Sequence, residues 1–117
     1  MGRLTTHVLD TAHGKAASGV GISLYRIGDA KRHPVRDTAT NADGRCDAAL
    51  LEGDALLAGV YELDFHVGAY YARLGVALPV PNFLDIVTVR FGVADAHAHY
   101  HVPLTVTPWS YATYRGS

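Results

Sequence analysis

The sequence consists largely of short runs in which apolar and polar residues alternate with a period of two. Successive side chains of an extended strand point to opposite faces, so such runs predict strands with one buried and one exposed face. The clearest run covers residues 59–67 (GVYELDFHV), where Tyr61, Leu63 and Phe65 share the face that we expect to be buried. This pattern favours a fold built almost entirely from strands.

The same pattern recurs along the chain and is interrupted by glycine, proline, asparagine and aspartate residues, which are typical of turns. We expect further strands at residues 3–9, 20–27, 34–40, 84–93, 97–107 and 109–114. Residues 28–33 are predicted as a turn, residues 41–44 as a hairpin turn, and residues 50–57 as either a short strand or a turn. Residues 69–75 (AYYARLG) form the one predicted helix, which Gly75 would end. Seven or eight short strands separated by turns are typical of a β-sandwich.

Length and composition fit one globular domain over residues 1–117, with 49% hydrophobic and 18% charged residues. The formal net charge of −1 gives no electrostatic reason to expect nucleic acid or an anionic membrane as a partner. No apolar run approaches the roughly 20 residues needed to span a bilayer, and the N-terminal segment lacks the apolar stretch of a secretory signal. We therefore expect a soluble, cytoplasmic protein. Cys46 is the only cysteine, so an intrachain disulfide is excluded.

Three histidines near the C-terminus are spaced by two residues in the segment AHAHYH. On an extended strand, His97, His99 and His101 would share one face. Imidazole titrates near neutral pH, so such a face suits acid–base catalysis. Successive side chains would lie roughly 6–7 Å apart, which allows two of them to bind one zinc ion but strains a set of three. From the residues alone, acid–base chemistry, a metal site and simply solvated histidines all remain open.

Three segments together resemble one known family. They are LTTHVLDTAHGKAASG at residues 4–19, TNADGR at residues 40–45 and HYHVPLTVTPWSYATYRGS at residues 99–117. In order and spacing they resemble the transthyretin-related family of 5-hydroxyisourate hydrolases, and the terminal YRGS is absent from the hormone-carrying transthyretins. The resemblance implies an all-β, transthyretin-like sandwich of two sheets, with about eight strands and one short helix. It also implies a homotetramer, a dimer of dimers whose central channel holds the active sites.

The resemblance further implies an activity and the residues that carry it. The activity is the hydrolysis of 5-hydroxyisourate to 2-oxo-4-hydroxy-4-carboxy-5-ureidoimidazoline in urate degradation, without a cofactor or a metal ion. The implied catalytic residues are His7, Arg45, His101 and Ser117, and the implied substrate-binding residues are His99, Tyr114, Arg115 and Gly116. We expect one of the imidazoles of His7 and His101 to deprotonate a water molecule, and Arg45 to bind the planar substrate and stabilise the developing oxyanion.

Three departures from the family pattern lie outside these residues. Ala16 occupies a position that is usually proline, residues 105–108 (TVTP) replace the usual L-L-S-P, and Ala112 replaces a usual serine. We expect them to affect loop stiffness and packing rather than the chemistry.

Two other functions are compatible with parts of the sequence. A transthyretin-like carrier of a small apolar ligand would use the same channel, but such a channel is typically lined by apolar groups rather than by imidazoles and a guanidinium. A zinc-dependent hydrolase would use His97, His99 and His101 together, and metal analysis of the purified protein would detect it.

Overall fold

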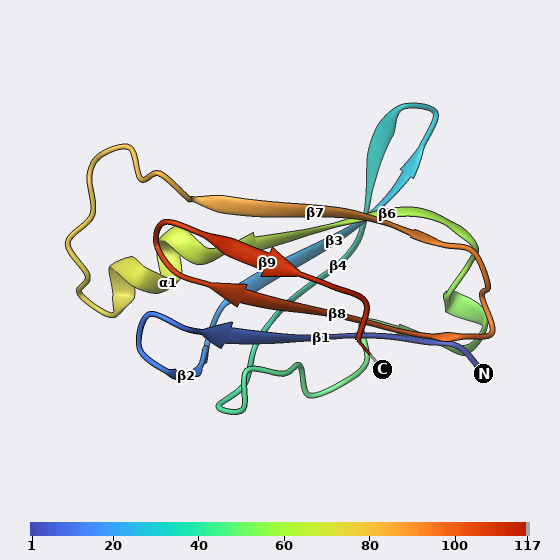
Figure 1. The fold of residues 1–117 in the computed structure, drawn as a ribbon. Coiled ribbons are helices and arrows are strands. Elements are labelled where there is room, and N and C mark those ends of the chain that lie inside the picture. Colours follow the sequence, from blue (N-terminus) through green and yellow to red (C-terminus); the bar gives the residue numbers. More distant parts are fainter. Residues whose placement is uncertain (117) are drawn as a thin grey trace.

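The computed structural model describes residues 1–116, which form two β-sheets packed face to face with one short α-helix at one end (Figure 1). One sheet has the strand order β2–β1–β8–β9, with β5 also paired to β1, and the other has the order β4–β3–β6–β7. The elements are β1 (Arg3–Asp10), β2 (Lys15–Ala16), β3 (Gly21–Gly28), β4 (Lys31–Ala39), β5 (Leu51–Glu52), a 3₁₀ turn (Gly53–Ala55), β6 (Gly59–His66), α1 (Val67–Arg73), β7 (Ile86–Val93), β8 (His99–Val106) and β9 (Tyr111–Thr113). The β-sandwich expected from the sequence is therefore confirmed.

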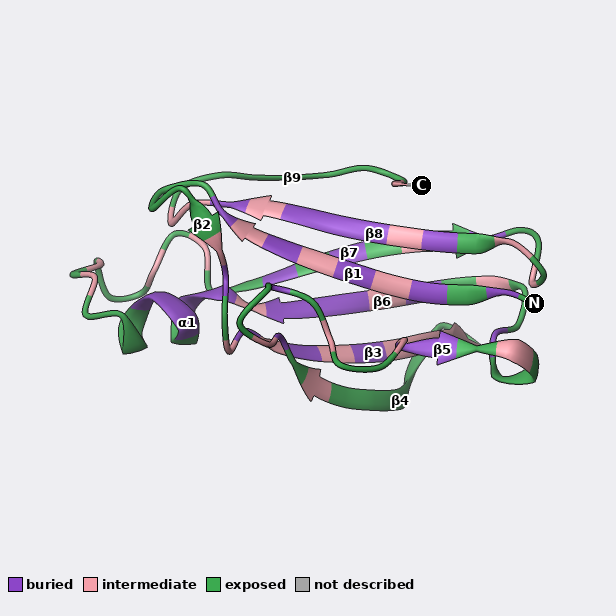
Figure 2. Ribbon diagram, turned by 90° about the horizontal axis from the view of Figure 1, so that it is seen from below, coloured by how far each residue is buried: buried purple, intermediate pink, exposed green. Residues whose placement is uncertain are grey.

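Alternation along the strands produces the core between the two sheets. On β1, residues 4, 6, 8 and 10 are buried while the residues between them are partly exposed, and Figure 2 shows this as bands of two colours. The predicted inward face of β6 is also correct, since Tyr61, Leu63 and Phe65 are each at most 1% exposed. Burying a side chain of this size stabilises the fold by roughly 1.5–3 kcal/mol. The opposite faces of the strands stay available for polar side chains.

The strand expected at residues 34–40 begins earlier than predicted, so the turn expected at residues 28–33 is shorter than predicted. β3 and β4 are joined by only two residues, Asp29 and Ala30, whose φ angles are 54° and 59°. Two consecutive residues in this region form the tight hairpin that matches the twist of paired strands. The charged residues that follow belong to β4, which is an edge strand exposed along almost its whole length (Figure 2). Charge on an edge strand discourages pairing with other chains.

Other boundaries also differ from the prediction. The helix begins at Val67 and ends at Arg73, and Gly75 follows it with a φ of 77°, as expected for a glycine that ends a helix. Residues 50–57 divide between β5 and the 3₁₀ turn. The last strand is shorter than residues 109–114 because Trp109 lies in a turn, where its N–H donates to Thr107 Oγ1.

A further boundary change concerns the histidine segment. β8 begins at His99. His97 lies in the preceding turn, where its N–H donates to Asp95 Oδ1 at 2.9 Å. The predicted face of three histidines is therefore wrong, and only His99 and His101 lie on the strand.

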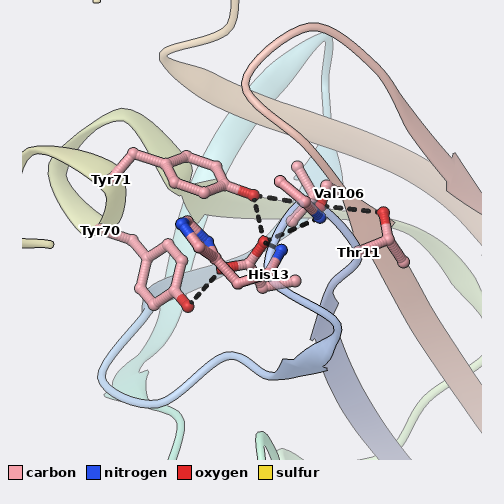
Figure 3. Close-up of polar contacts among 7 residues, drawn as sticks. Thr11, His13, Tyr70, Tyr71 and Val106 are labelled. Carbon is pink, nitrogen blue, oxygen red and sulfur yellow. Dashed lines mark hydrogen bonds and ion pairs between the residues drawn. The ribbon is translucent and has the colours of Figure 1, made fainter. Parts of the chain in front are cut away.

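A buried carboxylate fastens the helix to the end of β1. Asp10 is fully buried and accepts hydrogen bonds from Tyr70 Oη at 2.8 Å, Tyr71 Oη at 2.9 Å and His13 Nδ1 at 2.6 Å. The backbone N–H groups of Ala12 and His13 donate to it as well. Figure 3 shows the two tyrosines reaching from α1 toward His13 and Val106. Burial by itself would raise the pKa of Asp10, but these hydrogen bonds outweigh burial and lower it.

Within residues 1–116, no buried side-chain nitrogen or oxygen lacks a hydrogen-bond partner. No helix in the same part of the chain is long and apolar enough to cross a membrane.

Candidate functional site

The outer face of β1 and β8 carries the imidazoles that the sequence analysis singled out. The two strands are parallel, and their register places Thr5 opposite His101 and Arg3 opposite His99. Since Leu4 and its alternate neighbours fill the core, Thr5 and His7 project from the opposite side of β1. Strand pairing thus brings together side chains from the two ends of the chain.

Arg45 reaches this face through a turn that leaves one sheet and docks on the other. After β4, Asn41 Oδ1 accepts hydrogen bonds from the N–H groups of Asp43 and Arg45, and the Gly44 carbonyl accepts one from Val8 N–H at 2.8 Å. Gly44 has a φ of 75°, and a Cβ there would collide with the Val8 carbonyl. Only glycine combines a readily accessible positive φ with the absence of a Cβ atom.

The turn places Arg45 beside His7, because these two residues form a short antiparallel bridge. The segment was expected to be a hairpin turn, which would join two neighbouring strands. Instead it crosses between the sheets and lays its end against β1.

His7 is held by the same turn. Its Nε2 lies 2.9 Å from the carbonyl oxygen of Asp43. A carbonyl oxygen only accepts hydrogen bonds, so Nε2 carries the proton, and the lone pair of the neutral ring is on Nδ1.

His99 and His101 share one hydroxyl group. Thr5 Oγ1 lies 2.8 Å from His101 Nδ1 and 3.1 Å from His99 Nε2. Thr5 was not among the predicted site residues. Alternation places it on the same face as His7, but nothing in a threonine at that position marks it as part of a site.

The electrostatic environment keeps His101 neutral. Burial of the ring lowers the pKa of His101, and the nearby Arg45, His7 and His99 groups lower it further, while a hydrogen bond with the Thr5 backbone opposes the change. An imidazole whose pKa is lowered from 6.5 is mostly unprotonated at neutral pH. It can therefore accept a proton from water.

These groups face an open cavity of about 550 Å³, within the usual range for sites that bind small molecules. Its lining is mainly polar and comprises Arg3, Thr5, Thr6, Arg45, Cys46, Asp47, Ala48, Ala49, Glu52, His99 and His101. His7 is not part of the lining and lies beside it, bonded to the turn that carries Arg45. Three of the predicted site residues, Arg45, His99 and His101, thus line one cavity. Burial raises the pKa of the Cys46 thiol, so this cysteine is not an activated nucleophile.

The chain after β9 runs back along β8 and touches His101. Gly116 N–H donates to the His101 carbonyl at 2.8 Å, and a Cβ on Gly116 would lie 2.6 Å from His101 Cδ2. Such a contact excludes any residue other than glycine unless the imidazole moves. Gly116 therefore lies against the ring, as a site residue would, whereas Ser117 lies outside the described residues.

Tyr114 and Arg115 lie away from this cavity in the single chain. They line a separate, mainly apolar groove of about 340 Å³ together with residues of β7. Arg115 donates to the His99 carbonyl at 3.2 Å and places its guanidinium carbon 4.2 Å from the centre of the Tyr100 ring. Their predicted contact with substrate remains a prediction.

The zinc alternative requires His97, His99 and His101 on one face, and His97 is not there. Among residues 1–116, no group of three or more His, Cys, Asp or Glu side chains is arranged to hold a metal ion.

Comparison with known proteins shows which family and which solved structures this chain resembles. A model of the HIUase/Transthyretin family matches residues 4–116. The chain is 65% identical over 117 residues to the 5-hydroxyisourate hydrolase of Ralstonia nicotianae, with 100% of each chain covered. A solved structure of Klebsiella pneumoniae 5-hydroxyisourate hydrolase matches with a TM-score of 0.83 and 34% identity, again over 100% of each chain. Sea bream transthyretin in complex with thyroxine matches with a TM-score of 0.87 and 26% identity, over 97% of this chain and 94% of that one.

Proposed function

We infer that this chain, which belongs to the HIUase/Transthyretin family, hydrolyses 5-hydroxyisourate in urate degradation, as the name of its relative from Ralstonia nicotianae indicates. The product expected from the sequence analysis is 2-oxo-4-hydroxy-4-carboxy-5-ureidoimidazoline. The observation that carries the proposal is the meeting of Arg45 with the neutral imidazole of His101 at one polar cavity. A neutral base beside a fixed cation is the combination that hydrolysis of a cyclic amide needs.

His101 is the general base in this proposal. It lines the cavity, whereas His7 does not, and its lowered pKa leaves it able to take a proton at neutral pH. The imidazole removes a proton from water while the water oxygen bonds to a ring carbonyl carbon of the substrate. The resulting tetrahedral intermediate collapses by breaking the ring C–N bond, and the leaving nitrogen takes the proton back from His101.

Arg45 stabilises the negative charge that forms on the carbonyl oxygen. Its guanidinium offers several N–H donors in one plane, which suits the planar, acidic substrate as well as the oxyanion. His7 helps to hold Arg45 in place, because it pairs with Arg45 in a short antiparallel bridge and its Nε2 bonds to the Asp43 carbonyl of the same turn. His99 lines the same polar cavity and, in this proposal, binds substrate together with Gly116.

Ser117 directly follows Gly116, which contacts the His101 ring, so we propose that its hydroxyl positions water or substrate there. Tyr114 and Arg115 are proposed to contact substrate once subunits assemble. The assembly that we propose is a homotetramer built as a dimer of dimers. The free edges of β7 and β9 and the exposed Trp109 and Tyr111 support it, because apolar strand edges are usually covered by a partner.

A carrier function similar to that of transthyretin is less well supported. Sea bream transthyretin was solved with thyroxine bound, and a cavity that holds an apolar ligand is usually lined by apolar side chains. Here the lining includes Arg3, Arg45, Glu52 and two imidazoles. The cytoplasmic location expected from the sequence remains a prediction.

The test is to generate 5-hydroxyisourate from urate with urate oxidase and to follow its absorbance with and without this protein. Wild-type protein should accelerate the decay, and His101→Ala should abolish the acceleration. His33→Ala is the matched control, because His33 lies on the exposed strand β4 of the other sheet. Decay that is no faster with wild-type protein than without it would overturn the proposed activity. Full activity of His101→Ala would overturn the role of this histidine.

A further inference from the structure

We propose that Thr5 is a positioning residue whose hydroxyl fixes the proton of His101 on Nδ1 and thereby leaves the lone pair of Nε2 for catalysis. The inference rests on the proposed function, since it explains how His101 is prepared to act as a base. It concerns a residue that lies in the segment at residues 4–19 but was not among the implied site residues.

The contact is set by strand pairing rather than by a flexible loop. Thr5 and His101 are direct partners in the parallel β1–β8 ladder, and His99 is two residues earlier on the same face. Thr5 Oγ1 therefore lies between the two rings, at 2.8 Å from His101 Nδ1 and 3.1 Å from His99 Nε2. β-Branched threonine has few rotamers on a strand, so the hydroxyl is held in place.

A hydroxyl group has one proton, which decides how the three groups share their hydrogen bonds. Its oxygen has two lone pairs, so the hydroxyl can accept two hydrogen bonds but can donate only one. In the first arrangement His101 Nδ1–H donates to Thr5, and Thr5 either donates to His99 Nε2 or accepts from it. In the second arrangement Thr5 donates to His101 Nδ1, and His101 carries its proton on Nε2.

The surroundings of His101 favour the first arrangement. Nδ1 is the ring nitrogen that lies against the Thr5 hydroxyl, and the Thr5 backbone favours the protonated form of the His101 ring, as a nearby acceptor would. Cδ2 faces Gly116. Within residues 1–116, Nε2 of His101 has no hydrogen-bond partner, and it is the ring nitrogen left for the cavity.

The tautomer of a histidine is set by the hydrogen bond at its other nitrogen. With the proton fixed on Nδ1, the neutral ring presents a lone pair at Nε2 in every molecule. Without the Thr5 hydroxyl, the ring is free to carry its proton on Nε2. Nε2 then has no lone pair with which to act as a base.

The experiment compares Thr5→Val, which keeps the shape but removes the hydroxyl, with Thr5→Ser, which keeps the hydroxyl. Thr5→Val should lower kcat by about 10- to 100-fold, the range typical of lost partners that orient a reactive group, with a smaller change in KM. The pH below which kcat/KM falls should move downward, because the protonated ring loses an acceptor. Thr5→Ser should restore most of the rate. Thr105→Val is the matched control on the outer face of β8, since Thr105 is no part of the cavity lining.

The tautomer itself is measured by ¹⁵N NMR of the histidine rings, with His101→Gln used to assign the signal. Wild-type protein should have the His101 proton on Nδ1, and Thr5→Val should move it to Nε2. A wild-type His101 protonated on Nε2, or a Thr5→Ser variant as slow as Thr5→Val, would overturn the inference even if the protein hydrolyses 5-hydroxyisourate. A protein with the expected tautomers and no hydrolysis would refute the proposed function while leaving the tautomer assignment intact.

Discussion

Strand β1 carries two polar clusters on its opposite faces, and the two clusters differ in how completely their groups are bonded. On the inner face, the Asp10 carboxylate is fully buried and is surrounded by donors from α1 and from the turn that contains His13. On the outer face, the imidazoles are partly exposed, and at least one ring nitrogen of His101 is left for the cavity among the described residues.

The difference follows from the free-energy cost of leaving a polar group unpaired in each environment. A buried polar group without a partner destabilises the fold by about 1–3 kcal/mol, so the inner cluster must be complete. At a solvated cavity, water occupies an unpaired nitrogen at little cost until a substrate replaces it. The inner cluster should therefore control stability, and the outer cluster should control activity.

The largest expected effect is that of Asp10→Ala on stability. Removing the carboxylate leaves the buried Tyr70 hydroxyl without its acceptor and leaves Tyr71 Oη with only the Val106 carbonyl, and the free energy of unfolding should fall by roughly 3–5 kcal/mol. Urea denaturation measures it. Asp37→Ala on the exposed strand β4 is the control and should change little. A loss below about 1 kcal/mol for Asp10→Ala would mean that the inner cluster is not needed for stability.

Arg45→Ala should have the opposite effect to Asp10→Ala: activity should fall and stability should change little. Losing the cation that we propose stabilises the oxyanion should reduce kcat by about 10²- to 10³-fold, while the unfolding free energy changes by less than about 1 kcal/mol, because the side chain faces an open cavity. Rate assays and urea denaturation of the same preparation decide between the two effects. Arg36→Ala, on exposed β4, should change neither. An Arg45→Ala variant that is unstable but fully active per folded molecule would reverse the assignment.

A smaller effect is expected from Gly116→Ala. The added Cβ would lie 2.6 Å from His101 Cδ2 and would push the ring out of position. Misplacing a catalytic group by about 1 Å can cost up to roughly 10²-fold in rate, so we expect a loss of about 10-fold with stability unchanged. Gly92→Ala is the matched substitution, because a Cβ there meets open space. Equal rates for the two variants would show that the terminal segment does not position His101.

The smallest effect should be visible in pH profiles. The pKa of His101 is lowered from 6.5, so kcat/KM should fall to half its plateau value at a pH below 6.5. The pKa of Asp10 is lowered from 3.8, so its contribution to stability is present above that pH and is lost as the pH falls below it. Activity should therefore disappear at a higher pH than the fold. Simultaneous loss of both would contradict the separation of the two clusters.

Much of the fold was predictable because alternation is a local property. The buried faces of β1 and β6 were predicted correctly, since each depends only on the order of neighbouring residues. The errors arose where the geometry of a turn, rather than alternation along a strand, decided the outcome. The β3–β4 hairpin closes through Asp29 and Ala30, neither of which is a glycine, and His97 is held out of β8 by one hydrogen bond to Asp95.

The candidate site was predictable in its residue types and less so in its arrangement. Resemblance to a family pointed to Arg45, His99 and His101, which do line one cavity, but it gave no reason to include Thr5 or Glu52. It also could not place Tyr114 and Arg115, whose position depends on where the chain turns after β9.

The sequence by itself determined which side chains face the core and which face outward, because successive residues of a strand point to opposite faces and the alternation can be read from neighbouring residues. Only the tertiary structure decided which outward side chains meet. Thr5 contacts imidazoles 94 and 96 positions away, because β1 and β8 pair in parallel in one particular register. Arg45 joins them because Gly44 allows a turn from one sheet to dock on the other. A shift of one residue in that register would turn Thr5 away from both rings, so the pairing of distant strands, rather than any local pattern, creates the site.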